Sequence, residues 1–232
     1  MLHEVEAAGW DEVGRAAVLV ADTVAAGGLI HVFGTGHSHL MAEELFYRAG
    51  GLAQVNPILV DPLMLHSGAA RSTRLERVPG LAAALLESES VGPDDLMIVV
   101  SNSGGNATGI EMLLAARDLG LSTIALTSMK HASAGSARAG TGPRLHDLAD
   151  VVLDNRGTAG DAAVTPAGGS VAVAPTSTVI GAAILNAVVA EAVELLLARG
   201  VIPDVFASSN LAGGDEINRA LLDTYASRVR AL

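Results

Sequence analysis

The chain contains no cysteine and few aromatic residues. Without cysteine there are no disulfide bonds, no thiolate nucleophile and no cysteine-ligated zinc. Aromatic residues make up only 3% of the 232 residues although half of the sequence is hydrophobic, so Ala, Val, Leu and Ile must build the core. Small aliphatic side chains of this kind are typical of helices packed closely on a parallel sheet.

Positive charge is also scarce. Lys and Arg total 14 residues against 25 Asp and Glu, which gives a formal net charge of −11. A protein that binds nucleic acid through many phosphate contacts needs the opposite balance, so we expect no nucleic-acid partner. One small phosphate ligand is still compatible with this charge, because backbone amides and a helix N-terminus can hold a single anion.

Long apolar segments are missing as well. No uninterrupted apolar run reaches the roughly 18 residues of a transmembrane helix, and the nearest, residues 179–193, contains Asn186 and Glu191. The first residues include Glu4 and Glu6, where a secretory signal would be basic and then apolar. We therefore expect a cytoplasmic protein without a membrane partner.

Short β-branched runs alternate with helical patterns along the chain. Strands are expected over 29–33, 54–60, 95–100, 122–127 and 149–153, and helices over 10–26, 40–48, 79–88, 110–119, 175–199 and 215–230. Residues 61–77 are expected to form a loop, and residues 155–175 a loop or flap with a short strand near 171–174. The alternation predicts right-handed crossovers. We expect an α/β fold with three α/β/α layers, doubly wound around a mainly parallel five-stranded sheet of the flavodoxin-like type. A single domain over 1–232, with an N-terminal and a C-terminal helix, is the simplest organisation.

Two glycine- and serine-rich turns follow the first and third expected strands. They read Phe33-Gly-Thr-Gly-His-Ser38 and Ser101-Asn-Ser-Gly-Gly-Asn106. Ligands of open α/β sheets bind outside the carboxyl ends of the strands, which is where both turns belong. Glycines expose backbone amides, serines add hydroxyl donors, and a helix N-terminus favours an anion. Each turn alone also fits ordinary helix capping, but together they predict a phosphate site.

The sequence matches neither of two common nucleotide-binding motifs. Gly34 and Gly36 begin a GxGxxG pattern, but His39 stands where the third glycine belongs, and no Gly-Lys-Ser/Thr follows for a Walker loop. His37 and His39 are two residues apart and do not share a helix face, and no nearby carboxylate–histidine spacing completes a metal site. We therefore expect neither a cofactor nor a metal.

The sequences FGTGHS and VVSNSGGNATGIE resemble the SIS (sugar isomerase) domain of phosphosugar isomerases and binding proteins. The resemblance runs from about Gly28 to Arg199 and is strongest to uncharacterised bacterial SIS proteins related to phosphoheptose isomerases. It implies an SIS fold, a sugar phosphate as ligand, and a homodimer or homotetramer. By this resemblance, Ser101, Ser103 and Asn106 hold the phosphate. The full set of expected substrate-binding residues is Ser38, Ser101, Asn102, Ser103, Gly105, Asn106, Ser177 and Thr178.

Isomerisation of a sugar needs a base for a carbon-bound proton and an acid or base near the sugar oxygens. The expected catalytic residues are Glu44, His37 and His66. Glu44 lies in an Ala-Glu-Glu-Leu stretch that resembles the corresponding helix of phosphoheptose isomerases, although an ion pair with Arg48 is the ordinary alternative. His37 and His66 are equally compatible with solvated polar residues.

Glu76 and Asp161 are further candidates, and His31, inside an apolar strand, is expected to be structural. The late helix has no histidine where phosphoheptose isomerases place a catalytic one, so a heptose substrate does not follow from the resemblance. The sequence predicts a protein that binds a phosphorylated sugar and isomerises it, by aldose–ketose or amino-sugar chemistry. A non-catalytic sugar-phosphate sensor and a phosphosugar lyase (etherase) are the alternatives.

Overall fold

The computed structural model describes residues 1–134 and 142–232. Its centre is a five-stranded sheet in the order β2-β1-β3-β4-β5, and every neighbouring pair is parallel. The strands are β1 (Ile30–Gly34), β2 (Val55–Ile58), β3 (Leu96–Val100), β4 (Ser122–Thr127) and β5 (Val151–Asp154). This strand order is the flavodoxin-like one, and it confirms the predicted doubly wound α/β fold.

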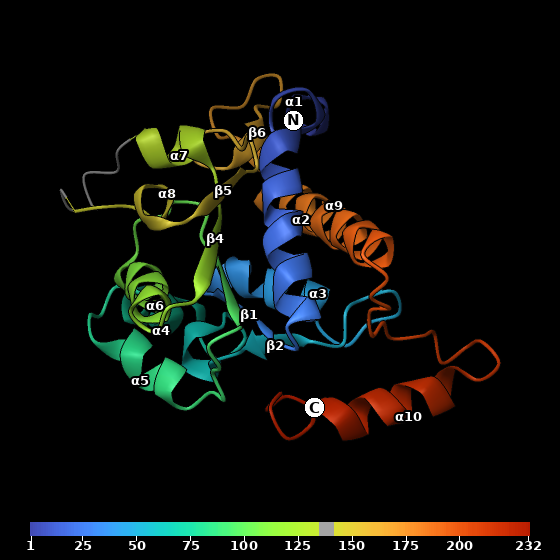
Figure 1. Ribbon diagram of the computed structural model, residues 1–232. Helices are drawn as coiled ribbons and strands as arrows, with labels where there is room; N and C mark the ends of the chain where they lie inside the picture. The colour runs from blue at the N-terminus through green and yellow to red at the C-terminus, as the bar shows by residue number, and fades with distance from the viewer. Residues whose placement is uncertain (135–141) are drawn as a thin grey trace.

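Helices cover both faces of the sheet (Figure 1). The α-helices are α1 (Leu2–Ala8), α2 (Trp10–Ala25), α3 (Leu40–Leu45), α4 (Ala69–Leu75), α5 (Leu81–Glu87), α6 (Ala107–Asp118), α7 (Met129–Ser133), α8 (Leu145–Leu148), α9 (Ser177–Ala198) and α10 (Gly214–Tyr225). Two 3-10 turns, η1 (Gly36–His39) and η2 (Asp61–Leu63), lie between them.

The core is split by the sheet into two apolar layers. Alternate residues of β3 point to opposite faces, as the period of two in a strand requires: Leu96 and Ile98 pack with α2, α3 and α9, whereas Met97 and Val99 pack with α5 and α6. Buried alanines on α2 let α9 lie closely against it. The sparse aromatic content is therefore matched by small side chains at the contacts between helices and sheet.

Several predicted boundaries were wrong. Residues 61–77 are not one loop, because α4 forms within them and the buried Ser72 donates from its hydroxyl to the Leu63 carbonyl at 2.6 Å. The helix expected to reach residue 48 ends at Leu45, since Phe46 is extended and Tyr47 has a φ of 43°. The sequence patterns did not predict the short helices α1, α7 and α8.

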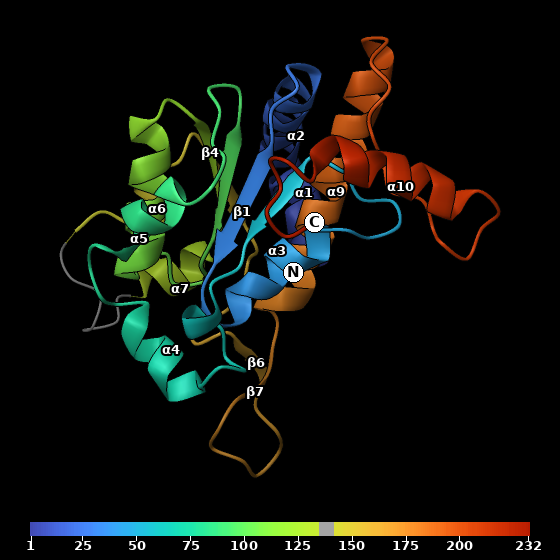
Figure 2. The same ribbon diagram turned by 90° about the horizontal axis from the view of Figure 1, so that it is seen from below.

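The segment after β5 forms a small hairpin, as a flap with a short strand was expected. Strands β6 (Ala162–Val164) and β7 (Val173–Pro175) pair antiparallel and lead into α9. Figure 2 shows the hairpin projecting from the body of the molecule beside the start of α9. The hairpin's base thus lies next to the first turn of that helix.

The C-terminal segment, which contains α10, packs at the end of the sheet opposite to the hairpin. Helix α10 lies near the amino ends of the strands (Figures 1 and 2), where Leu221 and Phe206 pack with Ala53. Beyond α10, Arg228 donates to both carboxylate oxygens of Asp95, at 2.9 and 2.8 Å. The C-terminal segment is therefore attached at the amino end of β3, at the opposite end of the strands from their carboxyl ends.

Helix α9 is long and apolar enough to span a membrane by length and composition alone, despite Asn186 and Glu191. Core helices of soluble proteins pass the same test, and one face of α9 is buried against the sheet, α2 and α3. Its other face leaves apolar residues exposed, including Val179 and Leu197.

Candidate functional site

The first glycine-rich turn places His37 and Ser38 at the carboxyl end of β1. Gly34 has no room for a side chain, because an added Cβ would lie 2.6 Å from the carbonyl carbon and oxygen of Ser38. His39 is buried, bonded to the Gly36 carbonyl, and 3.4 Å from a carboxylate oxygen of Glu43. His39 therefore holds the turn, while His37 stays exposed at the surface of the site.

The second turn, residues 101–106, presents several hydrogen-bond donors at the start of α6. Gly104, at a φ of 61°, folds back and donates to the carbonyl and the hydroxyl of Ser101, at 3.1 and 3.2 Å. Within residues 1–134 and 142–232, the Ser103 hydroxyl and the backbone amides of Ser103, Gly105 and Asn106 donate to no protein acceptor. Asn106 is the N-cap of α6, yet its side chain makes no capping bond. These donors lie at the N-terminus of α6, a helix of 12 residues.

A pair of side-chain amides attaches this turn to the far strands. The Asn155 amide donates to Oδ1 of Asn102 at 3.0 Å, and Oδ1 of Asn155 accepts from the Gly157 amide at 2.9 Å. Asn155 is 3% exposed, so its orientation is fixed by these bonds. The turn after β3 is thereby tied to the end of β5.

The first turn of α9 is the third element at this end of the sheet, and Asp161 caps it. Asp161 Oδ1 accepts from the backbone amides of Thr176 and Ser177 at 3.1 and 2.9 Å, and its Oδ2 accepts from the Ser177 hydroxyl at 2.6 Å. The carboxylate of Asp161 therefore caps α9 from the hairpin base. Asp161 has a φ of 68°, a conformation that Asp and Asn adopt more readily than most residues.

These elements surround one cleft at the carboxyl ends of β1 and β3, the point where the strand order reverses. Its empty space is about 270 Å³, part of it open to solvent. The lining residues are His37, Ser38, Met41, Val100, Asn102, Leu126, Asn155, Ser177 and Thr178. The cleft thus combines an apolar floor with hydroxyl, amide and imidazole groups, which suits a small polar ligand.

The family model described as "SIS domain" matches residues 1–128, more than half of the chain. The chain belongs to the SIS-domain family. The UPF0309 protein of Geobacillus thermodenitrificans is 46% identical over 222 residues, covering 96% of this SIS protein and 89% of the relative. A UPF0309 protein of Listeria monocytogenes serotype 4b is 44% identical over 222 residues, an alignment that covers 96% of this chain and 90% of the Listeria protein.

Solved structures with a similar fold are more distant. A phosphoheptose isomerase from Francisella tularensis matches 78% of this SIS protein and 85% of its own chain, at 15% identity and a TM-score of 0.49. The Vibrio vulnificus NanR protein complexed with ManNAc-6P matches 94% of this chain and 62% of its own, at 15% identity and a TM-score of 0.44. At such values neither likeness says anything about the ligand of this SIS protein.

The cleft of the SIS domain brings together five of the predicted site residues: His37, Ser38, Asn102, Ser177 and Thr178. Ser101, Ser103, Gly105 and Asn106 belong to the turn at its edge. Among the residues that sequence reasoning missed, Asn155 is the clearest. Its signal was its position directly after β5, at the same edge of the sheet as both turns.

The other predicted catalytic residues lie around the cleft and do not line it. Glu44, one turn along α3 from Met41, is paired with Arg48 and accepts from the Asn186 amide at 2.8 Å. His66 is exposed, with its ring centre 6.5 Å from that of His39.

Glu76 links two of the ligand-side segments. Its carboxylate accepts from the Thr35 hydroxyl at 2.7 Å, and its backbone carbonyl accepts from Thr108. It therefore joins the turn after β1 to the first turn of α6. Throughout the described ranges, no group of three or more His, Asp or Glu side chains is placed to hold a metal ion.

Proposed function

We propose that this SIS protein binds a phosphorylated sugar, with the phosphate on the turn of residues 101–106. The observation that supports this most directly is that Ser103, Gly105 and Asn106, at the N-terminus of α6, present donors with no acceptor among residues 1–134 and 142–232. A phosphate has several acceptor oxygens and a negative charge, so it satisfies several amides at once and is favoured by the helix dipole. The Ser101 hydroxyl accepts from Gly104, which leaves its own proton to donate.

The sugar then extends toward α9. Hydroxyl groups of a sugar both donate and accept, and the Asn102 and Asn155 amides, Ser38 and Thr178 supply matching partners along the cleft. Met41, Val100 and Leu126 form the apolar wall against which the carbon skeleton lies. We propose these groups as the sugar-binding residues.

The proposed reaction is an isomerisation that moves a proton between adjacent carbons of the sugar. His37 is the titratable side chain among the cleft-lining residues, and its imidazole is suited to accept and return a proton near neutral pH. Glu44 is the second candidate base, although Arg48 and Asn186 hold its carboxylate between α3 and α9. Loss of turnover with retained binding in Glu44→Gln identifies Glu44 as a base. Full turnover in that variant assigns Glu44 to the link between the two helices.

A binding function without turnover is the second candidate. It is favoured by the cleft's lining, in which the described residues include one titratable side chain and no carboxylate. A sensor needs only the phosphate and hydroxyl contacts, whereas an isomerase needs proton transfer as well.

A thermal-shift screen tests the proposal. Pentose, hexose, heptose and amino-sugar phosphates are each paired with the unphosphorylated sugar, because a ligand that binds only the native state raises its melting temperature. We expect stabilisation by at least one sugar phosphate and not by its free sugar. Incubation of that ligand with the protein, followed by NMR, separates isomerisation, elimination and binding alone. No stabilisation by any sugar phosphate at millimolar concentration contradicts the proposed function.

We also propose that the protein forms a homodimer or homotetramer. The exposed face of α9 carries Val179 and Leu197, which are 67% and 55% exposed in the single chain. A second copy covering this face would remove that apolar area from water. Light scattering after size exclusion measures the assembly directly, and a monomer at micromolar concentration contradicts this part of the proposal.

A further inference from the structure

The first turn of α9 lines the cleft and the turn before α6 lies at its edge, but only the N-terminus of α9 is capped by a carboxylate. The N-terminus of α6 offers amides that have no acceptor in the described part of the chain, whereas that of α9 already holds the Asp161 carboxylate. Ser177, which donates to Asp161 from both its amide and its hydroxyl, is itself a cleft-lining residue. The negative charge of Asp161 is therefore one hydrogen bond away from the cleft wall.

We propose that Asp161 determines substrate specificity: its carboxylate excludes sugar phosphates that carry a second anionic group at the α9 end of the cleft. This inference rests on the proposed function, because it assumes that the ligand's phosphate lies on the turn of residues 101–106. It also fixes the direction of the ligand, with the phosphate at α6 and a neutral end of the sugar at α9.

The physical reason is that a second anion would meet a site whose donors are already used. The amides of Thr176 and Ser177 are saturated by Asp161, so they offer a second phosphate or a carboxylate no compensation for lost water. Like charges about 6 Å apart near a protein surface repel strongly enough to weaken binding at least about tenfold. A neutral hydroxyl meets no such penalty, and the remaining lone pairs of the carboxylate can accept from it.

The substitution Asp161→Asn removes the charge and keeps the local structure. Its side-chain oxygen can still accept from both backbone amides, and its amide nitrogen can donate to the Ser177 hydroxyl oxygen. Asn also tolerates the φ of 68° at this position. The variant therefore separates the charge of Asp161 from its role as a cap of α9.

Asp150→Asn is the matched control. Asp150 accepts from the amide and the hydroxyl of Thr123, each at 2.8 Å, so it makes the same kind of contacts as Asp161 makes with Ser177. It lies just before β5, at the amino end of the strands, away from the cleft. It loses the same charge without changing the site.

Titration calorimetry measures the affinities of wild type and both variants for fructose 6-phosphate and fructose 1,6-bisphosphate, and for glucose 6-phosphate and glucose 1,6-bisphosphate. We expect the wild type to prefer the monophosphate at least about tenfold. Asp161→Asn should reduce that preference by about tenfold, and Asp150→Asn should preserve it. Equal affinities in the wild type, an unchanged preference in Asp161→Asn, or an equal change in Asp150→Asn overturns this inference alone. Absence of binding by every sugar phosphate overturns the proposed function and this inference with it.

Discussion

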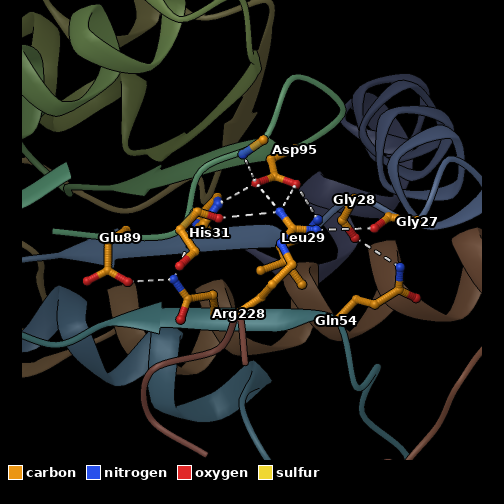
Figure 3. Close-up of polar contacts among 11 residues, drawn as sticks. Gly27, Gly28, Leu29, His31, Gln54, Glu89, Asp95 and Arg228 are labelled. Atoms are coloured by element: carbon orange, nitrogen blue, oxygen red, sulfur yellow. Dashed lines mark hydrogen bonds and ion pairs between the residues drawn. The ribbon is translucent and has the colours of Figure 1, made fainter. Parts of the chain in front are cut away.

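Removal of the buried Asp95 carboxylate should destabilise the fold without altering the cleft. Figure 3 shows Asp95 near the amino ends of the strands, with Leu29, His31 and Arg228 around its carboxylate. Its oxygens accept from the amides of Leu29 and Gly92 at 2.7 and 2.6 Å, and Nε2 of His31 lies 2.9 Å away. Arg228, from the chain end, adds the contacts described above.

The size of the effect follows from burial. Asp95 is 3% exposed, so a lost hydrogen bond there cannot be replaced by water. Asp95→Asn removes the charge and directs an NH₂ group at donors, which should lower the free energy of unfolding by about 3–5 kcal/mol. Arg228 is 35% exposed, and Arg228→Ala leaves the other three donors in place, so we expect a loss of only about 1 kcal/mol.

The effect should also depend on pH. Burial by itself raises the pKa of the Asp95 carboxyl, but hydrogen bonds from His31, Leu29, Gly92 and Arg228 outweigh it and hold the pKa well below its usual range. The unfolded carboxyl titrates near pH 4, so below about pH 4 the unfolded chain binds a proton that the folded chain does not. The stabilisation from Asp95 is therefore complete above that pH and falls as the pH is lowered.

Urea unfolding of wild type and Asp95→Asn, at pH 7 and in steps down to pH 3, measures both effects. We expect a large difference at pH 7 that narrows below about pH 4. A difference under 1 kcal/mol at pH 7, or one that does not change with pH, would refute this reasoning. Sugar-phosphate affinity of the folded variant should equal that of the wild type, because the network lies at the opposite end of the strands from the cleft.

Two further predictions concern the site. Gly34→Ala places a methyl group against the Ser38 backbone, so it should lower the free energy of unfolding by about 1–3 kcal/mol and weaken ligand binding. Gly14→Ala is the control: an added Cβ there has nothing within 4 Å, so its stability should be unchanged or higher. Urea unfolding and titration calorimetry measure both variants. Equal behaviour of the two variants would show that the turn tolerates a side chain. His37→Gln should lower turnover at least about 100-fold, because it removes the group proposed to accept and return the proton; unchanged kcat by NMR would exclude His37 as the acid/base group.

The fold was predictable because its signals are local. Most of the five strands are short runs rich in β-branched or aliphatic residues, and Gly34 and Ser101 open the two turns at the carboxyl ends of β1 and β3. Strand β2, which contains Asn56 and Pro57, is the exception. The strand order then brings the turns after β1 and β3 together, since these strands are neighbours in the sheet. His37, Ser38 and Asn102 could be placed at one site for that reason alone.

The features that the sequence did not predict depend on contacts between segments that are distant in the chain. The cap formed by Asp161 on Ser177 joins residues 16 apart through a hairpin whose register no local pattern specifies. Helix α4 has a weak apolar pattern and is held by the bond from Ser72 to Leu63. Asn155 could be recognised only after β5 was known to end beside β4.

The central claim is that the turn of residues 101–106 holds a phosphate, and titration calorimetry of Ser103→Ala tests it most directly. The ligand is the sugar phosphate found in the screen, and Ser88→Ala, on the remote end of α5, serves as the control. We predict that Ser103→Ala weakens binding by about 1–3 kcal/mol through loss of a charge-assisted hydrogen bond, while Ser88→Ala binds as the wild type does. Unchanged affinity of Ser103→Ala would contradict the assignment of the phosphate to this turn.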